Sequence, residues 1–366
     1  MKKVLVVVGA RPNFIKISQF PRVFKKYRGD LQCKIVHTGQ HYDDKMSTVF
    51  FKQLGIHPDF YLDVKPGTPA TQMAQIMLGL ESLLSTRYRA DLVLVVGDVN
   101  STLAGALTAN KMNIPVGHVE SGLRSFDRDM PEEFNRVLAD QVCDLLFVTE
   151  KSGEANLLKE GKSRKQISFV GNTMIDTLVA FDKEIKRSDI LDKLSLGGRP
   201  FVLMTMHRPS NVDTREGLRK LQDLIGFISR RYAVVFPIHP RTIARLREFR
   251  MERSFKSNKN LFFTEPLDYF AFQKLIISSS FIVTDSGGIQ EESTFRKVPC
   301  LTLRPNTERP STVSLGTNSL VPFELETIAE HIGRIESGKY KKGKIPPFWD
   351  GRSTERIVKT IRQFLR

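Results

Sequence analysis

The chain has 366 residues, of which 40% are hydrophobic and 26% are charged, with 24 glycines and 18 prolines. This composition excludes collagen-like, disordered and small disulfide-stapled proteins, and the length gives room for about two domains with cores of their own. The formal net charge of +16 raises the question of nucleic-acid binding, but the basic stretches at 241–259 and 334–366 fit solvated helix faces, so no nucleic-acid partner is expected.

The first apolar run, at residues 4–8, follows two lysines and imitates a signal peptide. It is too short for one, and the sequence Arg-Pro-Asn at 11–13 interrupts it, so we expect a buried first strand. No apolar stretch approaches the roughly 18 residues of a membrane span. The three cysteines, Cys33, Cys143 and Cys300, are too far apart for a metal or redox motif. A reduced, cytoplasmic protein without a membrane partner is therefore expected.

Short apolar runs alternate with longer stretches of helical periodicity along both halves of the chain. The runs are 4–8, 34–36, 92–96, 116–119 and 145–148, and then 201–205, 233–238, 261–263, 281–283 and 299–303. Runs that do not alternate with polar residues are typical of strands buried on both faces, so we predict two doubly wound α/β domains with parallel sheets. The expected domains are residues 1–170 and 171–352, and the sequence leaves open which of them the last helix, 353–366, joins.

Ligands of open α/β sheets bind outside the carboxyl ends of the strands, which turns the predicted strands into a list of site residues. The first half offers Arg11, Lys16, Gln40, His41, Asp98, Glu120, Glu132 and Glu133, and the second offers His207, Arg208, His239, Glu265 and Asp285. Strand ends that face each other across an interdomain cleft would place carboxylates on one side and phosphate ligands on the other. This is the layout of an enzyme.

The turn at Ser286, Gly287 and Gly288 follows a predicted strand and opens a helix. Its glycines would let backbone amides approach a phosphate, whose charge the helix dipole favours, although Asp285 or Ser286 could instead simply cap the helix. Glu291 and Glu292, one turn further on, could hold ribose hydroxyls. Arg11 and Lys16 at the first strand's end could bind a diphosphate.

Three carboxylates, Asp98, Glu120 and Glu132, follow adjacent strands or open the next helix. They could be helix caps or first-turn charges, or they could form an acid–base cluster in which each raises the pKa of its neighbour. His207 is expected to contact a ligand. The turn at Gly9 lacks the further glycines of a dinucleotide fingerprint, and no metal motif is present, so neither a cofactor nor a metal is expected.

A set of collinear motifs resembles the UDP-N-acetylglucosamine 2-epimerase family. They are GARPNFIK (9–16), TGQHYD (38–43), GDVNST (97–102), HVESGLR (118–124), PEEFNR (131–136), VGN (170–172), MHR (206–208), DSGGIQEE (285–292) and TERP (307–310). The resemblance implies two Rossmann-like domains in a glycosyltransferase-B arrangement. It also implies reversible conversion of UDP-GlcNAc to UDP-ManNAc by the non-hydrolysing route, through elimination of UDP to 2-acetamidoglucal and re-addition, without a redox cofactor.

The same resemblance implies roles for individual residues. Asp98, Glu120 and Glu132 would be the catalytic carboxylates, His207 would lie near the diphosphate, and Lys16 would lie at the catalytic site. The nucleotide would be bound by Arg11, Ser286, Gly287, Gly288, Glu292 and Arg309. Gln40 and His41 would face a second, regulatory UDP-GlcNAc site, the enzyme would be a homodimer, and its product would serve polysaccharide biosynthesis.

Several alternatives stay open from the sequence. The chain could be a hydrolysing 2-epimerase, an epimerase of a UDP-diacetamido uronic acid, or a transferase of the glycosyltransferase-B type. The sequence does not assign which of Asp98, Glu120 and Glu132 is the base.

Overall fold

The computed structural model describes residues 1–39 and 44–366, which form two compact units. The first unit comprises Met1–Ala180 and Pro347–Arg366, and the second comprises Phe181–Pro346. The domain bounds expected from the sequence stay predictions.

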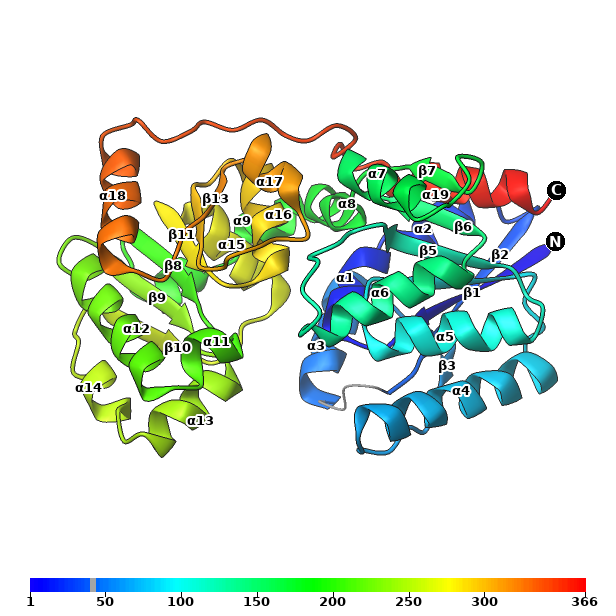
Figure 1. Ribbon diagram of the computed structural model, residues 1–366, viewed down its shortest axis with the longest axis horizontal. Helices are drawn as coiled ribbons and strands as arrows, with labels where there is room; N and C mark the ends of the chain where they lie inside the picture. Colours follow the sequence, from blue (N-terminus) through cyan, green and yellow to red (C-terminus); the bar gives the residue numbers. More distant parts are fainter. Residues whose placement is uncertain (40–43) are drawn as a thin grey trace. The chain divides into compact units, whose positions relative to one another are not determined.

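Within the described residues, the first unit is built on a seven-stranded sheet in the order β3-β2-β1-β4-β5-β6-β7 (Figure 1). All of its strand pairs are parallel. The strands are β1 (Lys2–Val8), β2 (Leu31–His37), β3 (Phe60–Tyr61), β4 (Leu92–Val96), β5 (Val116–Ser121), β6 (Leu145–Val148) and β7 (Ile167–Phe169). The helices are α1 (Arg11–Ile17), α2 (Phe20–Lys25), α3 (Asp44–Leu54), α4 (Pro69–Thr86), α5 (Asn100–Lys111), α6 (Pro131–Val142), α7 (Lys151–Lys159), α8 (Thr173–Ala180) and α19 (Ser353–Phe364).

The described part of the second unit holds a six-stranded parallel sheet in the order β10-β9-β8-β11-β12-β13. Its strands are β8 (Phe201–Thr205), β9 (Ala233–Pro237), β10 (Leu261–Thr264), β11 (Phe281–Thr284), β12 (Cys300–Thr302) and β13 (Asn318–Leu320). Its helices are α9 (Asp182–Arg187), α10 (Ile190–Lys193), α11 (Pro209–Val212), α12 (Arg215–Ile228), α13 (Pro240–Glu248), α14 (Glu252–Lys256), α15 (Tyr269–Ser278), α16 (Gly287–Arg296), α17 (Pro310–Ser314) and α18 (Leu325–Glu336). In both units the strand order reverses beside the first strand, where doubly wound sheets bind ligands.

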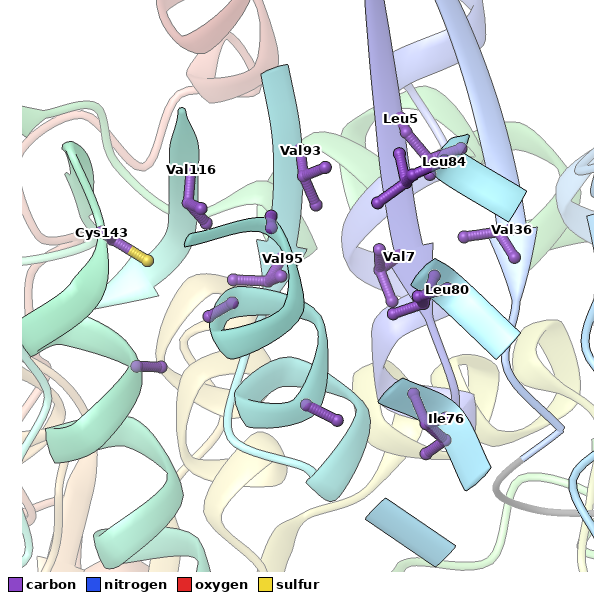
Figure 2. Close-up of a cluster of buried hydrophobic side chains, with 14 of the residues drawn as sticks. Leu5, Val7, Val36, Ile76, Leu80, Leu84, Val93, Val95, Val116 and Cys143 are labelled. Carbon is purple, nitrogen blue, oxygen red and sulfur yellow. The ribbon is translucent and has the colours of Figure 1, made fainter. Parts of the chain in front are cut away.

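The core of the first unit shows why these segments fold as strands and helices. Ile76, Leu80 and Leu84 recur at the four-residue spacing of one face of α4, and they pack against Leu5 and Val7 of β1 (Figure 2). All five side chains are buried. Since α5 and α6 contribute to the same cluster, the strands carry apolar residues without alternation.

The C-terminal helix α19 belongs to the first unit, where it packs against α2 and α8 (Figure 1). The buried Asp176 carboxylate of α8 accepts hydrogen bonds from the backbone N–H groups of Ser353 (3.0 Å) and Thr354 (2.6 Å) and from the Thr354 hydroxyl (2.7 Å). Just before the helix, the Trp349 indole donates to the Thr149 carbonyl. One carboxylate thus satisfies the free amides at the start of α19.

Each apolar run predicted as a strand forms one, with ends that differ by a few residues. The sequence missed β3, β7 and β13, whose two or three residues are too few to show a pattern. The basic stretch at 241–259, expected to lie on a solvated helix face, contains parts of two helices, α13 and α14, which are separated at Arg250 with its φ of 57°. Among the described residues, no helix has the length and apolar character needed to cross a bilayer.

Candidate active site

Glu120 lies at an irregularity in β5 that changes the direction of its side chain. The register of β5 against β6 shifts between Val119 and Ser121, and the φ of Glu120 is 73°, a left-handed value that non-glycine residues rarely adopt. Such strain persists only where the surrounding structure holds it, and it is concentrated at functional sites. The buried Glu120 carboxylate forms an ion pair with Lys16, with Nζ 2.7 Å from Oε2.

Lys16 reaches Glu120 from α1, which the neighbouring loop holds in place. Asn13 Oδ1 accepts from the N–H groups of Gly9 and Ala10, and its Nδ2 donates to the Val96 carbonyl at the end of β4. A Cβ placed on Gly97 would lie 3.0 Å from Lys16 Nζ. Lys16 therefore lies against both Glu120 and the turn that leads to Asp98.

Arg11 opens α1, and its guanidinium lies over the Phe50 ring at 4.3 Å from the centroid. Stacking on an aromatic face fixes the guanidinium while its N–H groups point outward in the plane.

Asp98 is held by an arginine that the sequence analysis did not single out. The Asp98 carboxylate forms an ion pair with the buried Arg136 of α6, which also donates to Glu133 Oε2 at 2.7 Å. Asn135 donates to the Asp98 carbonyl at 2.9 Å. Since Arg136 and Asn135 both belong to α6, this helix fixes the side chain and the backbone of Asp98 together.

Glu133, which the sequence analysis listed but gave no role, is a structural anchor of the preceding loop. Its carboxylate accepts from the N–H groups of Ser125 (2.9 Å) and Phe126 (3.0 Å). Burial alone would raise the pKa of Glu133, but these bonds and Arg136 hold it below the usual value. Glu132, by contrast, is exposed in the first turn of α6.

The first unit therefore joins Lys16, Glu120 and the Gly97–Asp98 turn by direct packing, and Glu132 lies on the helix whose Asn135 and Arg136 contact Asp98. The spacing of Glu133 and Arg136, three residues apart on a helix, was the available sequence signal for this network.

In the second unit, Asp285 organises the end of β8. Its buried Oδ2 accepts from the N–H groups of His207 (2.9 Å) and Arg208 (2.8 Å) and from Asn211 Nδ2 (3.2 Å), while Oδ1 lies 2.9 Å from His207 Nδ1. Burial raises the pKa of Asp285, yet the contacts with His207 and with both backbone amides outweigh it and hold the pKa below its usual value. Asp285 therefore orients His207, whose side chain stays 36% exposed, and the N-cap residue of α16 is Ser286.

The turn at residues 286–288 opens α16 beside Arg309. A Cβ on Gly287 would lie 2.7 Å from Arg309 Nη1 and 2.8 Å from Glu308 Oε1, so only glycine fits here without displacing them. Arg309 forms ion pairs with Glu308 and with the buried Glu291, the latter at 2.9 Å. Ser286 is the N-cap residue of α16, and Gly288 lies in its first turn.

Glu292 lies in the second turn of α16 and is buried. Burial and the nearby Glu291 charge raise the pKa of Glu292 to about 8. At neutral pH its carboxyl group therefore keeps a proton and can donate as well as accept a hydrogen bond.

Gln40 and His41, which were expected at a regulatory site, lie outside the described residues. Over residues 1–39 and 44–366, no group of three or more His, Cys, Asp or Glu side chains is arranged to hold a metal ion.

Comparison with known proteins identifies the family. The model of the UDP-N-acetylglucosamine 2-epimerase family matches residues 25–362. The UDP-N-acetylglucosamine 2-epimerase of Methanocaldococcus jannaschii is 40% identical over 98% of both chains. The chain therefore belongs to the UDP-N-acetylglucosamine 2-epimerase family.

Solved structures agree with this family assignment. The crystal structure of the M. jannaschii UDP-GlcNAc 2-epimerase in complex with UDP-GlcNAc and UDP superposes with a TM-score of 0.89 over 99% of both chains, at 38% identity. The Neisseria meningitidis UDP-GlcNAc 2-epimerase bound to UDP-GlcNAc gives 0.88 at 30% identity, over 99% of this chain and 100% of that one. With the two parallel sheets, these neighbours confirm the two-domain α/β fold of the glycosyltransferase-B type and an epimerase.

Not every relative is named for the same substrate. A Pseudomonas aeruginosa UDP-2,3-diacetamido-2,3-dideoxy-D-glucuronate 2-epimerase is 37% identical over 98% of this chain and 99% of that protein. Membership of the 2-epimerase family thus establishes the type of reaction more firmly than the substituents of the sugar.

Proposed function

We propose that this 2-epimerase interconverts UDP-GlcNAc and UDP-ManNAc by inverting C2 of the sugar. The observation that carries the proposal is the end-to-end likeness to epimerases that bind UDP-GlcNAc, at up to 40% identity. The paired carboxylates of the first unit and the glycine turn of the second supply the two kinds of group that this chemistry needs.

The chemistry favours elimination. The C2 proton has no neighbouring carbonyl, so its removal requires either temporary oxidation or departure of the group at C1. The Gly9 turn lacks the dinucleotide fingerprint, which supports departure. A carboxylate takes the C2 proton, the C1–O bond breaks with its electron pair leaving on UDP, and the C1=C2 bond of 2-acetamidoglucal forms. Re-addition of UDP with proton delivery to the opposite face completes the inversion.

The carboxylates Asp98, Glu120 and Glu132 are proposed as the acid and base groups. Asp98 forms an ion pair with Arg136 and Glu120 forms one with Lys16, and these contacts hold both carboxylates in place. Each correctly placed acid or base contributes roughly 10²- to 10⁴-fold to the rate.

Positively charged side chains and backbone amides are proposed to bind the leaving diphosphate. With Asp285 bound at Nδ1, His207 keeps its other ring nitrogen for the diphosphate. Arg11, Lys16 and Arg309, together with the turn formed by Ser286, Gly287 and Gly288, would bind the nucleotide, and Glu292 would bind the ribose.

Incubation with UDP-GlcNAc in heavy water tests the reaction. Deuterium should enter C2 and UDP-ManNAc should accumulate without an acceptor substrate. Free ManNAc with UDP would indicate a hydrolysing epimerase, and no exchange at C2 would contradict epimerisation and favour a transferase. A parallel incubation with UDP-2,3-diacetamido-2,3-dideoxy-glucuronate tests the alternative substrate that the P. aeruginosa relative suggests.

Regulation by UDP-GlcNAc through Gln40 and His41 and assembly as a homodimer also stay proposals. Sigmoidal dependence of rate on UDP-GlcNAc, lost in Gln40→Ala, would support the first. Sedimentation at twice the 41.7 kDa chain mass would support the second.

A further inference from the structure

His118 is a fully buried histidine of β5 with an oxygen at each ring nitrogen. Nδ1 lies 2.7 Å from Asp140 Oδ1, and Nε2 lies 2.7 Å from the Gly97 carbonyl oxygen. A neutral imidazole carries one N–H and can donate only once. A backbone carbonyl has no proton to give, so Nε2 must carry the hydrogen of that bond.

Asp140 is also an acceptor toward every neighbour. Its Oδ2 accepts from Gly122 N–H at 3.0 Å and from Arg124 Nη2 at 2.7 Å. Burial raises the pKa of Asp140, but the contacts with His118 and Arg124 outweigh this effect and keep the pKa below its usual value. The two ring nitrogens of His118 thus reach two different segments, the Asp140 carboxylate of α6 and the Gly97 carbonyl after β4.

Arg124 also forms an ion pair with Glu160 at 2.7 Å, so it connects Asp140 to the C-cap residue of α7. Lys16 lies beyond the Gly97 turn, where it is paired with Glu120.

The two hydrogen bonds of His118 join the segments that carry the carboxylates. His118 is two residues before Glu120, Gly97 directly precedes Asp98, and Asp140 belongs to α6 with Glu132. We propose that His118 positions the Gly97–Asp98 turn against β5 and α6 for the C2 proton transfer. This positioning role rests on the proposed function.

The positioning role is tested by two variants that each keep one hydrogen bond. In His118→Gln the new side-chain amide can replace Nε2 and donate to the Gly97 carbonyl, whereas in His118→Asn the shorter amide can replace only Nδ1 and reach Asp140. Both variants lose one buried bond, so their stabilities should fall alike. We expect His118→Gln to keep kcat within about threefold and His118→Asn to lose about 100-fold, as small displacements of catalytic groups do, with KM unchanged in both.

Hydrogen exchange of the peptide spanning residues 95–103 gives a readout that does not need activity. It should be faster in His118→Asn than in His118→Gln. Equal exchange, or equal kcat in an active enzyme, would overturn the positioning role. A wild-type protein that epimerises neither UDP-sugar would contradict the proposed function alone, because the exchange results would still decide whether His118 holds the Gly97–Asp98 turn in place.

Discussion

The Lys16 ammonium lies 2.7 Å from the Glu120 carboxylate, and both side chains are almost completely buried. The pair brings opposite charges from α1 and β5 to a strained point of the sheet. Breaking a buried pair leaves one charge without compensation, which costs more than the pair contributes.

We therefore expect Lys16→Met to lower the free energy of unfolding of the first unit by about 3 to 5 kcal/mol. Lys2→Met is the matched control, because Lys2 is half-exposed and its pair with Asp91 spans 3.4 Å. The control should change stability by less than about 1 kcal/mol. Urea denaturation, with hydrogen exchange to identify the unit that unfolds, measures both. Equal losses in the two variants would contradict the buried-pair interpretation.

Gly287→Ala should weaken UDP binding without unfolding the second unit. The added methyl would come within 2.7 Å of Arg309 Nη1 and displace it, at about 1 to 3 kcal/mol, or roughly 5- to 150-fold in affinity. In Gly226→Ala the methyl on α12 would meet no atom within 4 Å, so UDP affinity should stay unchanged. Titration calorimetry with UDP compares the two variants. An unchanged UDP affinity in Gly287→Ala would show that the position of Arg309 does not matter for nucleotide binding.

Glu292 should make the second unit less stable as the pH rises. Its pKa is about 8 in the folded protein and about 4.3 in an unfolded chain, so between these values the folded state holds a proton that the unfolded state has released. The stabilisation of the folded state by this proton is complete below about pH 4. It is lost as the pH approaches 8, at roughly 1 kcal/mol per pH unit.

Glu292→Gln removes this proton linkage, so its stability relative to the wild type should increase steadily from pH 5 to pH 8. Glu326→Gln, at an exposed position on α18, should parallel the wild type. Denaturation at pH 5, 6.5 and 8 gives the three curves. A constant difference between Glu292→Gln and the wild type would show that Glu292 is already ionised in this range.

Asp176→Ala should release the C-terminal helix. The variant loses three hydrogen bonds to the start of α19, worth about 3 kcal/mol together, and leaves buried N–H groups without an acceptor. Asp189→Ala, which removes an exposed pair with Lys193, is the control. Limited proteolysis should cut residues 347–352 faster in Asp176→Ala only. Unchanged protection would mean that the packing of α19 against α2 suffices to hold it.

The sequence located most of the fold because the signals were local. Runs such as 92–96 and 201–205 are apolar throughout, which a strand covered on both faces requires, and both form strands with those bounds. Strands of two or three residues, such as β3 and β7, exist only because longer neighbours provide hydrogen-bonding partners. No local pattern could reveal them.

By itself, the sequence determined the two α/β sheets, the family and the positions of the strand-end residues, because apolar periodicity and contiguous motifs are properties of neighbouring residues. The tertiary structure decided which of those residues contact an oppositely charged or hydrogen-bonding partner. The pairing of Lys16 with Glu120, of Asp98 with Arg136 and of His118 with Asp140 joins residues far apart in the chain. Such pairing depends on which strand ends lie side by side and on which helix covers them, and local sequence does not encode that relationship.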